Sequence, residues 1–198
     1  MAERWPEKWD VGMGLPSGKT VNLPLVRGED GFSIYALDMM GETVLNAEAA
    51  EALRQRLAAF DFDIILTAEA KAIALAQELA RSLNNMDYVV LRKSLKLYMH
   101  NPVSVEVKSI TTNNPQRFYL GEDKLQELCG KRICILDDVL STGGTMRAIM
   151  HLAEQTDCEI AVIAVVLTEE IGWQEFEGVP VVSLGHIPLP GASEFMTD

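Results

Sequence analysis

The sequence predicts an α/β fold, in which helices flank a central, mostly parallel β-sheet. From about residue 46 onward, short hydrophobic runs alternate with segments whose apolar residues recur at helical spacing, which indicates alternating strands and helices. The run I-A-V-I-A-V-V-L at 160–167 is hydrophobic on both sides, as expected for a parallel strand that helices cover on both faces. With 48% hydrophobic residues, the chain has enough apolar side chains to fill such a core.

The first part of this alternation contains two helices and two strands. Asn46 can cap a helix whose apolar positions, from Ala50 to Phe60, share one face. The elements that follow are a short buried strand with the sequence F-D-I-I-L-T at 62–67, a helix at 71–83 and a strand with the sequence Y-V-V-L-R at 88–92.

The second part repeats the same order. D-K-L-Q-E-L-C at 123–129 predicts a short helix, and I-C-I-L at 133–136 predicts a buried strand. Beyond a pair of glycines, Met146, Ile149 and their neighbours up to Ala153 mark one face of a further helix. The strand at 160–167 then completes the pattern.

Two regions fall outside the alternation. Residues 1–45 hold strand-like pieces at 20–26 and 31–37 around the turn R-G-E-D-G, which predicts a small cap. Residues 93–120 are rich in Lys, Asn, Ser and Thr, and a segment this long without regular structure is typical of a flexible binding loop, a lid or disorder. S-V-E-V-K-S-I-T at 104–111 predicts half of a hairpin within it.

We expect a single domain over residues 1–198. This length is typical of one domain, and the chain has no internal repeat, low-complexity tract or long Pro/Gly/Ser linker. Within the domain, residues 1–45 form an N-terminal extension, 46–170 the core and 171–198 a C-terminal part.

The charge of the chain limits its partners. Asp and Glu outnumber Lys and Arg by 29 to 17, and the net charge of -12 argues against nucleic acid or anionic membranes as partners. No apolar stretch approaches the roughly 18 residues of a membrane span, and the N-terminus lacks a signal pattern, so we expect a cytoplasmic protein. The three cysteines, Cys129, Cys134 and Cys158, lack C-x-x-C spacing, which predicts reduced thiols rather than disulfides or a zinc site.

Two adjacent aspartates end the strand at 133–136. Ligands of open α/β sheets bind beyond the carboxyl ends of the strands, so Asp137 and Asp138 are expected at the ligand edge. Carboxylates repel a phosphate but accept hydrogen bonds from hydroxyl groups, and a polyhydroxylated part of a ligand therefore suits them.

The S-T-G-G-T loop that follows suits a phosphate. Gly143 and Gly144 allow backbone N–H groups to converge on an anion at the start of a helix, and Ser141, Thr142 and Thr145 can add hydroxyl donors. A phosphate beside a diol indicates a ribose 5-phosphate. The alternative is a plain strand-to-helix connection, since a glycine-rich loop alone is a weak signal. The Walker lysine and the G-x-G-x-x-G pattern are both absent.

The complete pattern at 133–145, four apolar residues, Asp-Asp, two apolar residues and S-T-G-G-T, resembles the signature of the type I phosphoribosyltransferases. These proteins bind 5-phosphoribosyl 1-pyrophosphate (PRPP). The resemblance covers roughly residues 45 to 170 and is nearest to the adenine and xanthine (purine) enzymes and the related purine repressor domain. It implies that Asp137 and Asp138 bind the ribose hydroxyls and that residues 141–145 surround the 5-phosphate.

Two further segments resemble parts of the PRPP site. T-A-E-A-K-A-I at 67–73 is similar to the family's pyrophosphate loop and implies that Glu69, Ala70 and Lys71 bind PRPP, although the family often has glycine where this chain has Ala72. The alternative is an ordinary helix start, in which Glu69 complements the helix dipole.

The second segment follows the strand at 88–92. Arg92 and Lys93 resemble the Arg-Lys pair of purine enzymes and imply two cations that neutralise pyrophosphate; the alternative is a solvated loop stem. Glu106 matches a glutamate of the family's mobile loop, which implies a role in handling a proton of the base. With Asp137 and Asp138 it completes the expected catalytic set; its alternative is a solvated side chain.

The base is expected to lie under a hood built from the N-terminal extension and part of the C-terminal region. Candidates for stacking on the base or reading its edge are Phe32, Tyr35, Leu37 and Asp38, together with Glu169, Glu170 and Trp173 of the T-E-E-I-G-W segment. Among these, Leu37, Asp38 and Glu170 are the predicted base-binding residues. A carboxylate at 170, where xanthine enzymes commonly have a lysine nearby, suits an amino-purine such as adenine. The alternative places Trp173 in the core and the glutamates in solvent.

The resemblance implies transfer of phosphoribose from PRPP to a purine, with release of pyrophosphate. Mg²⁺ would bind through PRPP and pyrophosphate, without metal ligands from the protein, and the protein would form a homodimer. Two alternatives stay open: a PRPP- or nucleotide-binding regulator without transferase activity, and an enzyme that acts on orotate or another nitrogen acceptor.

Overall fold

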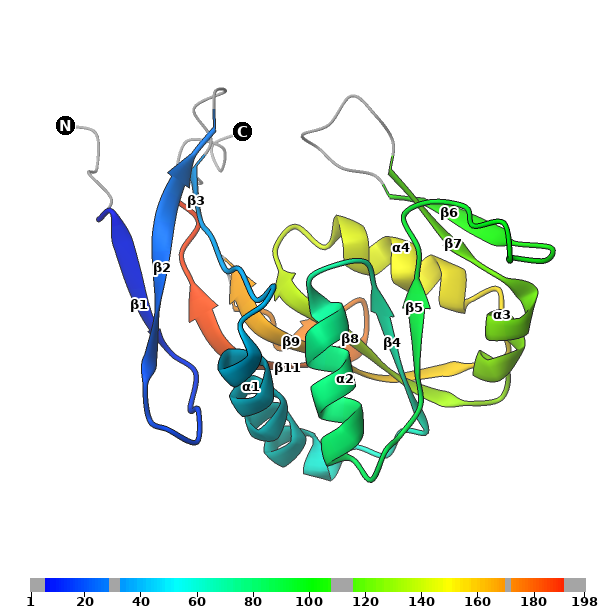
Figure 1. The fold of residues 1–198 in the computed structure, drawn as a ribbon, viewed down its shortest axis with the longest axis horizontal. Helices are drawn as coiled ribbons and strands as arrows, with labels where there is room; N and C mark the ends of the chain where they lie inside the picture. The colour runs from blue at the N-terminus through cyan, green and yellow to red at the C-terminus, as the bar shows by residue number, and fades with distance from the viewer. Residues whose placement is uncertain (1–5, 29–32, 108–115, 170–171, 191–198) are drawn as a thin grey trace.

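The computed structural model describes residues 6–28, 33–107, 116–169 and 172–190, and its centre is a six-stranded sheet (Figure 1). Every neighbouring pair is parallel except the short edge strand β10, which runs antiparallel to β11. The predicted fold class is therefore confirmed. In spatial order the strands are β10 (Glu175–Phe176), β11 (Val179–Ile187), β9 (Glu159–Glu169), β8 (Arg132–Leu140), β4 (Ile64–Ala68) and β5 (Tyr88–Leu91).

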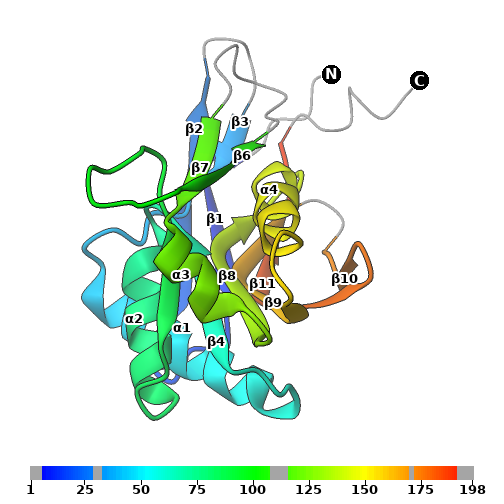
Figure 2. The same cartoon turned by 90° about the vertical axis from the view of Figure 1, so that its right-hand side faces the viewer.

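Helices cover both faces of the sheet because its strands alternate their apolar side chains between two hydrophobic clusters. On β4, Ile65 packs with helices α1 and α2, whereas Ile64 and Leu66 pack with α3 and α4. Figure 2 shows α1 and α2 on one side of the sheet and α4 on the other. The helices are α1 (Thr43–Arg56), continued by the 3₁₀ turn η1 (Leu57–Ala59), α2 (Ala72–Ser82), α3 (Glu122–Leu128) and α4 (Gly144–Ala153).

The first helix begins earlier than its sequence suggests. Asn46 does not cap it: α1 starts at Thr43, and Asn46 is buried in its first turn, where Nδ2 donates hydrogen bonds to the carbonyls of Met39 (2.7 Å) and Glu42 (2.8 Å). The prediction was wrong because the amide side chain bonds backward to the preceding turn instead of forward to the helix N–H groups.

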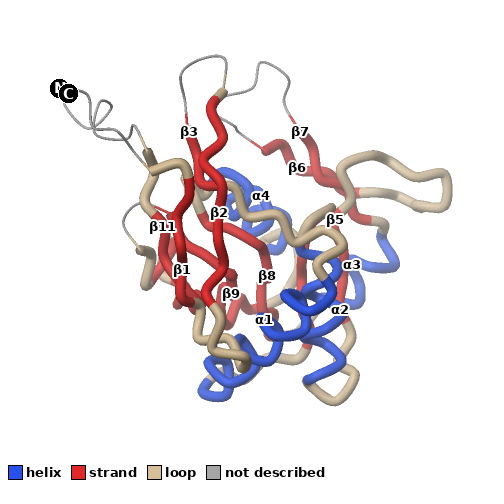
Figure 3. The backbone as a smooth tube through the Cα atoms, turned by 60° about the vertical axis from the view of Figure 1, so that its left-hand side comes forward, coloured by secondary structure: helices blue, strands red, loops and turns tan. Residues whose placement is uncertain are grey.

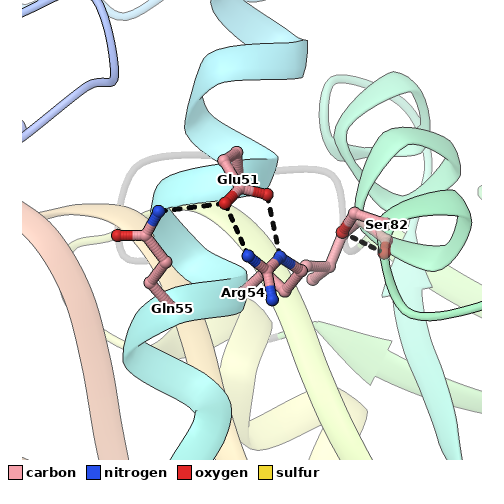
Figure 4. A network of polar contacts seen from close by, with 5 residues as sticks. Glu51, Arg54, Gln55 and Ser82 are labelled. Carbon is pink, nitrogen blue, oxygen red and sulfur yellow. Dashed lines mark hydrogen bonds and ion pairs between the residues drawn. The ribbon is translucent and has the colours of Figure 1, made fainter.

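The outer surface of α1 carries a local polar network. Glu51 accepts hydrogen bonds from Arg54 Nε (2.8 Å), Arg54 Nη2 (2.6 Å) and Gln55 Nε2 (2.9 Å), as Figure 4 shows. These interactions are between neighbours on one exposed helix, and they join no other element of the fold. The Arg54 side chain thus serves as a comparison for an arginine that bonds residues outside its own helix.

The N-terminal extension forms an antiparallel sheet of β1 (Lys8–Gly12), β2 (Thr20–Arg27) and β3 (Ser33–Tyr35). The strand expected at 20–26 is present as β2. Of the piece expected at 31–37, residues 33–35 form β3 and residues 31 and 32 lie outside the described residues; β1 is additional. Figure 3 shows this sheet beside β11. A Cβ atom on Gly185 of β11 would lie 2.9 Å from Val11 Cγ2 of β1, so the glycine permits the close contact between the two sheets.

The segment at 93–120 contains more regular structure than expected. The half hairpin predicted at 104–111 is confirmed over 104–107, within β6 (Val103–Val107), and its residues 108–111 lie outside the described residues. Strand β6 pairs with β7 (Gln116–Leu120), which was not predicted. The hairpin packs against α4 through Val105, Val107 and Phe118, which are all buried in the second hydrophobic cluster.

The structure bears on two further expectations, the state of the cysteines and the presence of a membrane-spanning helix. All three cysteines are free, as predicted; Cys134 is buried, whereas Cys129 is exposed. No helix in the described part of the chain is long and apolar enough to cross a membrane.

Candidate active site

Four neighbouring strands, β9, β8, β4 and β5, bring the predicted site segments to one edge of the sheet. Because these strands are parallel, their carboxyl ends meet at the same edge. Residues 69–71 follow β4, Arg92 and Lys93 follow β5, and the aspartates and the glycine loop lie at the end of β8. Segments separated by more than 60 residues in the sequence thus become neighbours.

The acidic pair lies within β8, next to β9. The Asp138 N–H donates a hydrogen bond to Asp137 Oδ1 at 2.9 Å. Burial and, next in importance, the adjacent Asp138 carboxylate raise the pKa of Asp137 to about 8, while the nearby Lys93 opposes this shift. A carboxyl group with this pKa exchanges its proton near neutral pH, so Asp137 can both donate hydrogen bonds to hydroxyl groups and accept them from these groups.

Lys71 joins three parts of this edge. Its Nζ lies 3.5 Å from Asp138 Oδ2 and donates a hydrogen bond to the carbonyl of Leu37 at 3.1 Å. The Lys71 side chain is 49% exposed, whereas that of Asp138 is 14% exposed. Lys71 therefore faces solvent at the mouth of the site and can exchange its partners for an anionic ligand.

Glu69 binds the segment after β5. Its Oε1 lies 2.6 Å from Arg92 Nε, and its Oε2 accepts a hydrogen bond from the Lys93 backbone N–H at 2.6 Å. Arg92 Nε is buried without an aligned hydrogen bond, so the contact between Arg92 and Glu69 is a charge contact. Glu69 is thus occupied by the cationic segment. The peptide bond between Glu69 and Ala70 is cis, and α2 begins two residues later.

The glycine loop connects β8 to α4. Gly143 has φ +79°, in the left-handed region that favours glycine, and Gly144 is the first residue of α4. A Cβ atom at 143 would lie only 2.3 Å from Cε2 of Phe176, a side chain that is 1% exposed. Glycine is therefore required at 143 by its backbone conformation and by the close packing of the loop on β10.

Glu106 lies on the hairpin side of the same loop. It is on β6, its side chain is 48% exposed, and it forms an ion pair with Arg117 of β7 at 3.3 Å. It lines a cleft of about 610 Å³ between the hairpin and α4, whose other lining residues include Thr142, Gly144 and Arg147. The structure thus brings Glu106 beside the glycine loop.

The base-binding candidates have different surroundings. The Leu37 side chain is 3% exposed and belongs to the core, so at this position only the backbone faces the site, where its carbonyl binds Lys71. Asp38 is exposed, and its Oδ1 accepts a hydrogen bond from the Met40 N–H. Tyr35 is 2% exposed and contacts Trp9, so its ring is not available for stacking on a base.

The remaining candidates lie at the C-terminal side. Glu169, the last residue of β9, is buried, and Phe32 and Glu170 lie outside the described residues. Trp173 is half-buried, and its Nε1 donates a hydrogen bond to the carbonyl of Ser141 at 3.1 Å. This contact with the glycine loop was not anticipated for Trp173.

Arg147 is the residue that sequence reasoning missed. Its Nη1 donates a hydrogen bond to the carbonyl of Thr142 at 3.0 Å, and its Nε donates one to Glu177 Oε1 at 2.6 Å. The available signal was an arginine one turn inside the helix that follows the Gly-Gly pair, a position from which a long side chain can reach back to the loop.

Known proteins share this arrangement of the chain. A family model described as a phosphoribosyl transferase domain matches residues 40–186. The chain belongs to the phosphoribosyltransferase family. The resemblance inferred from the motif at 133–145 is thereby confirmed.

Among the relatives of this phosphoribosyltransferase-family chain, one is named as a transcriptional repressor and another as an enzyme. The purine biosynthesis transcriptional repressor PurR of Bacillus subtilis (strain 168) is 26% identical over 71% of this chain, which spans only about half (48%) of the repressor. The adenine phosphoribosyltransferase of Mycoplasma mycoides subsp. mycoides SC is 30% identical over 69% of each chain.

Two solved structures support the fold. Adenine phosphoribosyltransferase from Thermoanaerobacter pseudethanolicus superposes with a TM-score of 0.71 at 23% identity, covering 83% of this chain and 95% of that one. The enzyme from Saccharomyces cerevisiae, solved with an imino-altritol bisphosphate and adenine, gives 0.62 at 20% identity, covering 82% and 93%. The parallel sheet and its connections are therefore those of the family.

Proposed function

We propose that the chain is a purine phosphoribosyltransferase, which transfers 5-phosphoribose from PRPP to an adenine-like base and releases pyrophosphate. The observation that carries the proposal is that the acidic pair with its glycine loop, after β8, and the basic segment after β4 meet at one edge of the sheet. A glycine loop suited to a phosphate monoester adjoins Asp137 and Asp138, and the lysine opposite Asp138 is Lys71, 3.5 Å away. PRPP carries a phosphate, a diol and a pyrophosphate in this order.

The aspartates would fix the ribose. Asp137, with its raised pKa, can donate a hydrogen bond to one hydroxyl while Asp138 accepts one from its neighbour. Their close spacing on β8 suits two adjacent hydroxyl groups, and holding the ring fixes C1 relative to the incoming base. In the reaction the bond from C1 to pyrophosphate breaks, a bond from C1 to a base nitrogen forms, and the base loses a proton.

The basic residues would bind the leaving pyrophosphate. Lys71 follows β4, and Arg92 and Lys93 follow β5; each has an acidic neighbour: Asp138, Glu69 and Asp137, respectively. Pyrophosphate would take over these interactions, and the cations would stabilise the negative charge that develops as it leaves.

Mg²⁺ would enter with the substrate. The described residues contain no group of three or more His, Cys, Asp or Glu side chains arranged to hold a metal ion. Mg²⁺ is commonly bound by substrate phosphates with few ligands from the protein, so PRPP and pyrophosphate would hold the ion while Asp137 and Asp138 bind the ribose hydroxyls. When bound, Mg²⁺ would supply positive charge to the pyrophosphate oxygens.

Turnover with a panel of bases tests the proposal. The purified chain, Mg²⁺ and PRPP are mixed with adenine, guanine, hypoxanthine, xanthine or orotate, and nucleotide and pyrophosphate are followed. We expect the fastest turnover with adenine. Absence of turnover with every base would overturn the proposed activity. Turnover with orotate alone would favour a different nitrogen acceptor.

A second candidate function is a PRPP-binding regulator without transferase activity. Its support is the similarity to the purine repressors and the residue Ala72, which is 1% exposed and fills with a methyl group a position where glycine was expected. PRPP binding in calorimetry, without turnover on any base, would favour this candidate. The homodimer, the cytoplasmic location and the roles of Glu106, Ala70 and Glu170 stay predictions.

A further inference from the structure

The outer side of the glycine loop is held by two side chains from other parts of the fold. Trp173 Nε1 donates to the Ser141 carbonyl at 3.1 Å, and Arg147 Nη1 donates to the Thr142 carbonyl at 3.0 Å. Two successive carbonyl groups of the loop are therefore bound by donors that do not belong to the loop itself.

These bonds fix the direction of two backbone N–H groups. In a trans peptide the carbonyl and the following N–H point in opposite directions. Among the described residues the one cis peptide is Glu69–Ala70, so the peptides after Ser141 and Thr142 are trans. The N–H groups of Thr142 and Gly143 consequently point away from Trp173 and Arg147.

The two donors are themselves held by a packed aromatic group. Phe176, which is 1% exposed, lies edge-on to Trp173 with ring centroids 5.2 Å apart. The Arg147 guanidinium lies 4.9 Å from the centre of the Phe176 ring, and Glu177 accepts from its Nε at 2.6 Å. The Phe176 ring also packs where a Cβ atom at Gly143 would lie. The same ring therefore contacts both donor side chains and the loop.

We propose that Trp173 and Arg147 are positioning residues, which turn the Thr142 and Gly143 N–H groups toward the 5-phosphate of PRPP. The proposal rests on the proposed function and specifies one end of the same ligand. Neutral N–H donors held in advance bind a phosphate monoester without reorganisation of the loop. The acidic chain, with its net charge of -12, thus gains a local anion site without placing a cation inside the loop.

The variants remove the donors and retain the packing. Trp173→Phe loses the indole N–H and keeps a ring beside Phe176, and Arg147→Met keeps an aliphatic side chain there. Arg54→Met is the matched control, since Arg54 is also a partly accessible arginine (40% exposed, against 51% for Arg147) with a carboxylate partner. It lies on α1, where its contacts are local (Figure 4).

Calorimetry measures two affinities for each variant, one for ribose 5-phosphate and one for pyrophosphate with Mg²⁺. Loss of one hydrogen bond corresponds to roughly 3- to 10-fold weaker binding of ribose 5-phosphate. The affinity for pyrophosphate, which binds at the other end of the site, should change less than about 2-fold, and Arg54→Met should change neither affinity. In wild-type chain labelled with ¹⁵N-threonine and ¹⁵N-glycine, the Thr142 and Gly143 amide signals should shift on addition of ribose 5-phosphate.

The outcomes separate the two hypotheses. Unchanged ribose 5-phosphate affinity in both variants would overturn the positioning role and leave the proposed function standing. Equal weakening for both ligands would also overturn it, because it indicates a general structural effect. No binding of ribose 5-phosphate or PRPP to the wild-type chain would overturn the proposed function, and the positioning role with it. If one variant does not fold, the other and the amide shifts still decide.

Discussion

The two ends of the candidate site are built in different ways. At the glycine loop, the neutral indole of Trp173 and the guanidinium of Arg147 donate to two carbonyl groups, so the N–H groups of the same two peptides point away from these side chains. At the other end, the cations Lys71 and Arg92 are in contact with Asp138 and Glu69. Under the proposed function, the loop would bind an anion without rearrangement, whereas the charged end would exchange its internal partners for the anion.

This difference predicts different costs for mutations. A mutation in the loop should lower both the stability of the fold and the affinity for the ligand, because the packing that holds the loop also sets the direction of its backbone N–H groups. A change at the charged end should mainly affect binding, since partly exposed ion pairs contribute about 0 to 1 kcal/mol to stability.

The largest effect is expected for Gly143→Ala. The methyl group would lie 2.3 Å from Phe176 Cε2, and alanine disfavours φ +79°. We expect the free energy of unfolding to fall by about 2–4 kcal/mol, the sum of overpacking and left-handed backbone terms, with loss of ribose 5-phosphate binding. Urea unfolding and calorimetry measure the two quantities.

Gly130→Ala is the control for this variant. Gly130 also has positive φ (+66°), but a Cβ there would meet nothing within 4 Å. It should lose only the backbone term, about 1–2 kcal/mol. Equal losses of stability in the two variants would mean that the contact with Phe176 contributes nothing to the cost of Gly143→Ala. The loop would then not be held by packing on Phe176.

The second prediction concerns Asp138→Asn. Replacing the carboxylate removes an acceptor for a ribose hydroxyl and frees Lys71 from its partner at 3.5 Å. Ribose 5-phosphate should bind roughly 10- to 100-fold more weakly, as for loss of a charge-assisted hydrogen bond, whereas pyrophosphate should bind at least as tightly as before. Parallel weakening of both ligands in calorimetry would show that Lys71 does not exchange partners.

The third prediction uses the raised pKa of Asp137. Since the folded-state pKa, about 8, exceeds the unfolded value near 4, the native state binds more protons between these values, and stability should fall as pH rises from about 5 to 8. The slope should approach at most about 1.4 kcal/mol per pH unit. Urea unfolding at several pH values measures it, and Asp137→Asn should flatten it.

Asp63→Asn is the matched control for the pH series. Arg132 lowers the pKa of Asp63. The contribution of this carboxylate to the free energy of unfolding is therefore lost only at acidic pH, as the pH falls through its folded-state pKa. The Asp63 variant should therefore keep the slope between pH 5 and 8. A wild-type slope of zero in this window would mean that Asp137 is ionised throughout and acts only as an acceptor.

Much of this architecture could be predicted from the sequence because the information is local. The apolar run of β8, its aspartates and the following glycines occur in one segment, and the family follows from that segment. Strand β11 was missed because Pro180 and Gly185 interrupt its pattern. The close packing of Val11 and Leu167 around position 185, which the sequence does not reveal, explains the glycine. Packing in the core likewise buries the Leu37 side chain, whereas Asn46 was misassigned because of local hydrogen bonds to the preceding turn.

The contacts of Trp173 and Arg147 could not be predicted for the same reason. Each donates to a carbonyl group, and every residue carries a carbonyl, so no sequence pattern identifies the acceptor. Trp173 and Ser141 are 32 positions apart in the sequence, and the pairing of β8 with β9 and the place of β10 at the sheet edge bring them together. The roles proposed for the site residues remain predictions for the measurements described above.

The smallest stability effect is expected for Lys71→Gln. Its side chain is 49% exposed and its contact with Asp138 is long, so the free energy of unfolding should change by less than about 0.5 kcal/mol. Glutamine removes the charge and keeps an N–H donor on a polar side chain that is one bond shorter. Pyrophosphate affinity should nevertheless fall roughly 3- to 10-fold, with ribose 5-phosphate affinity unchanged, because the cation serves one end of the ligand. Lys19→Gln, at an exposed position before β2, controls for net charge. A loss of stability above 1 kcal/mol in urea unfolding would show that the charged end, like the loop, is built into the fold.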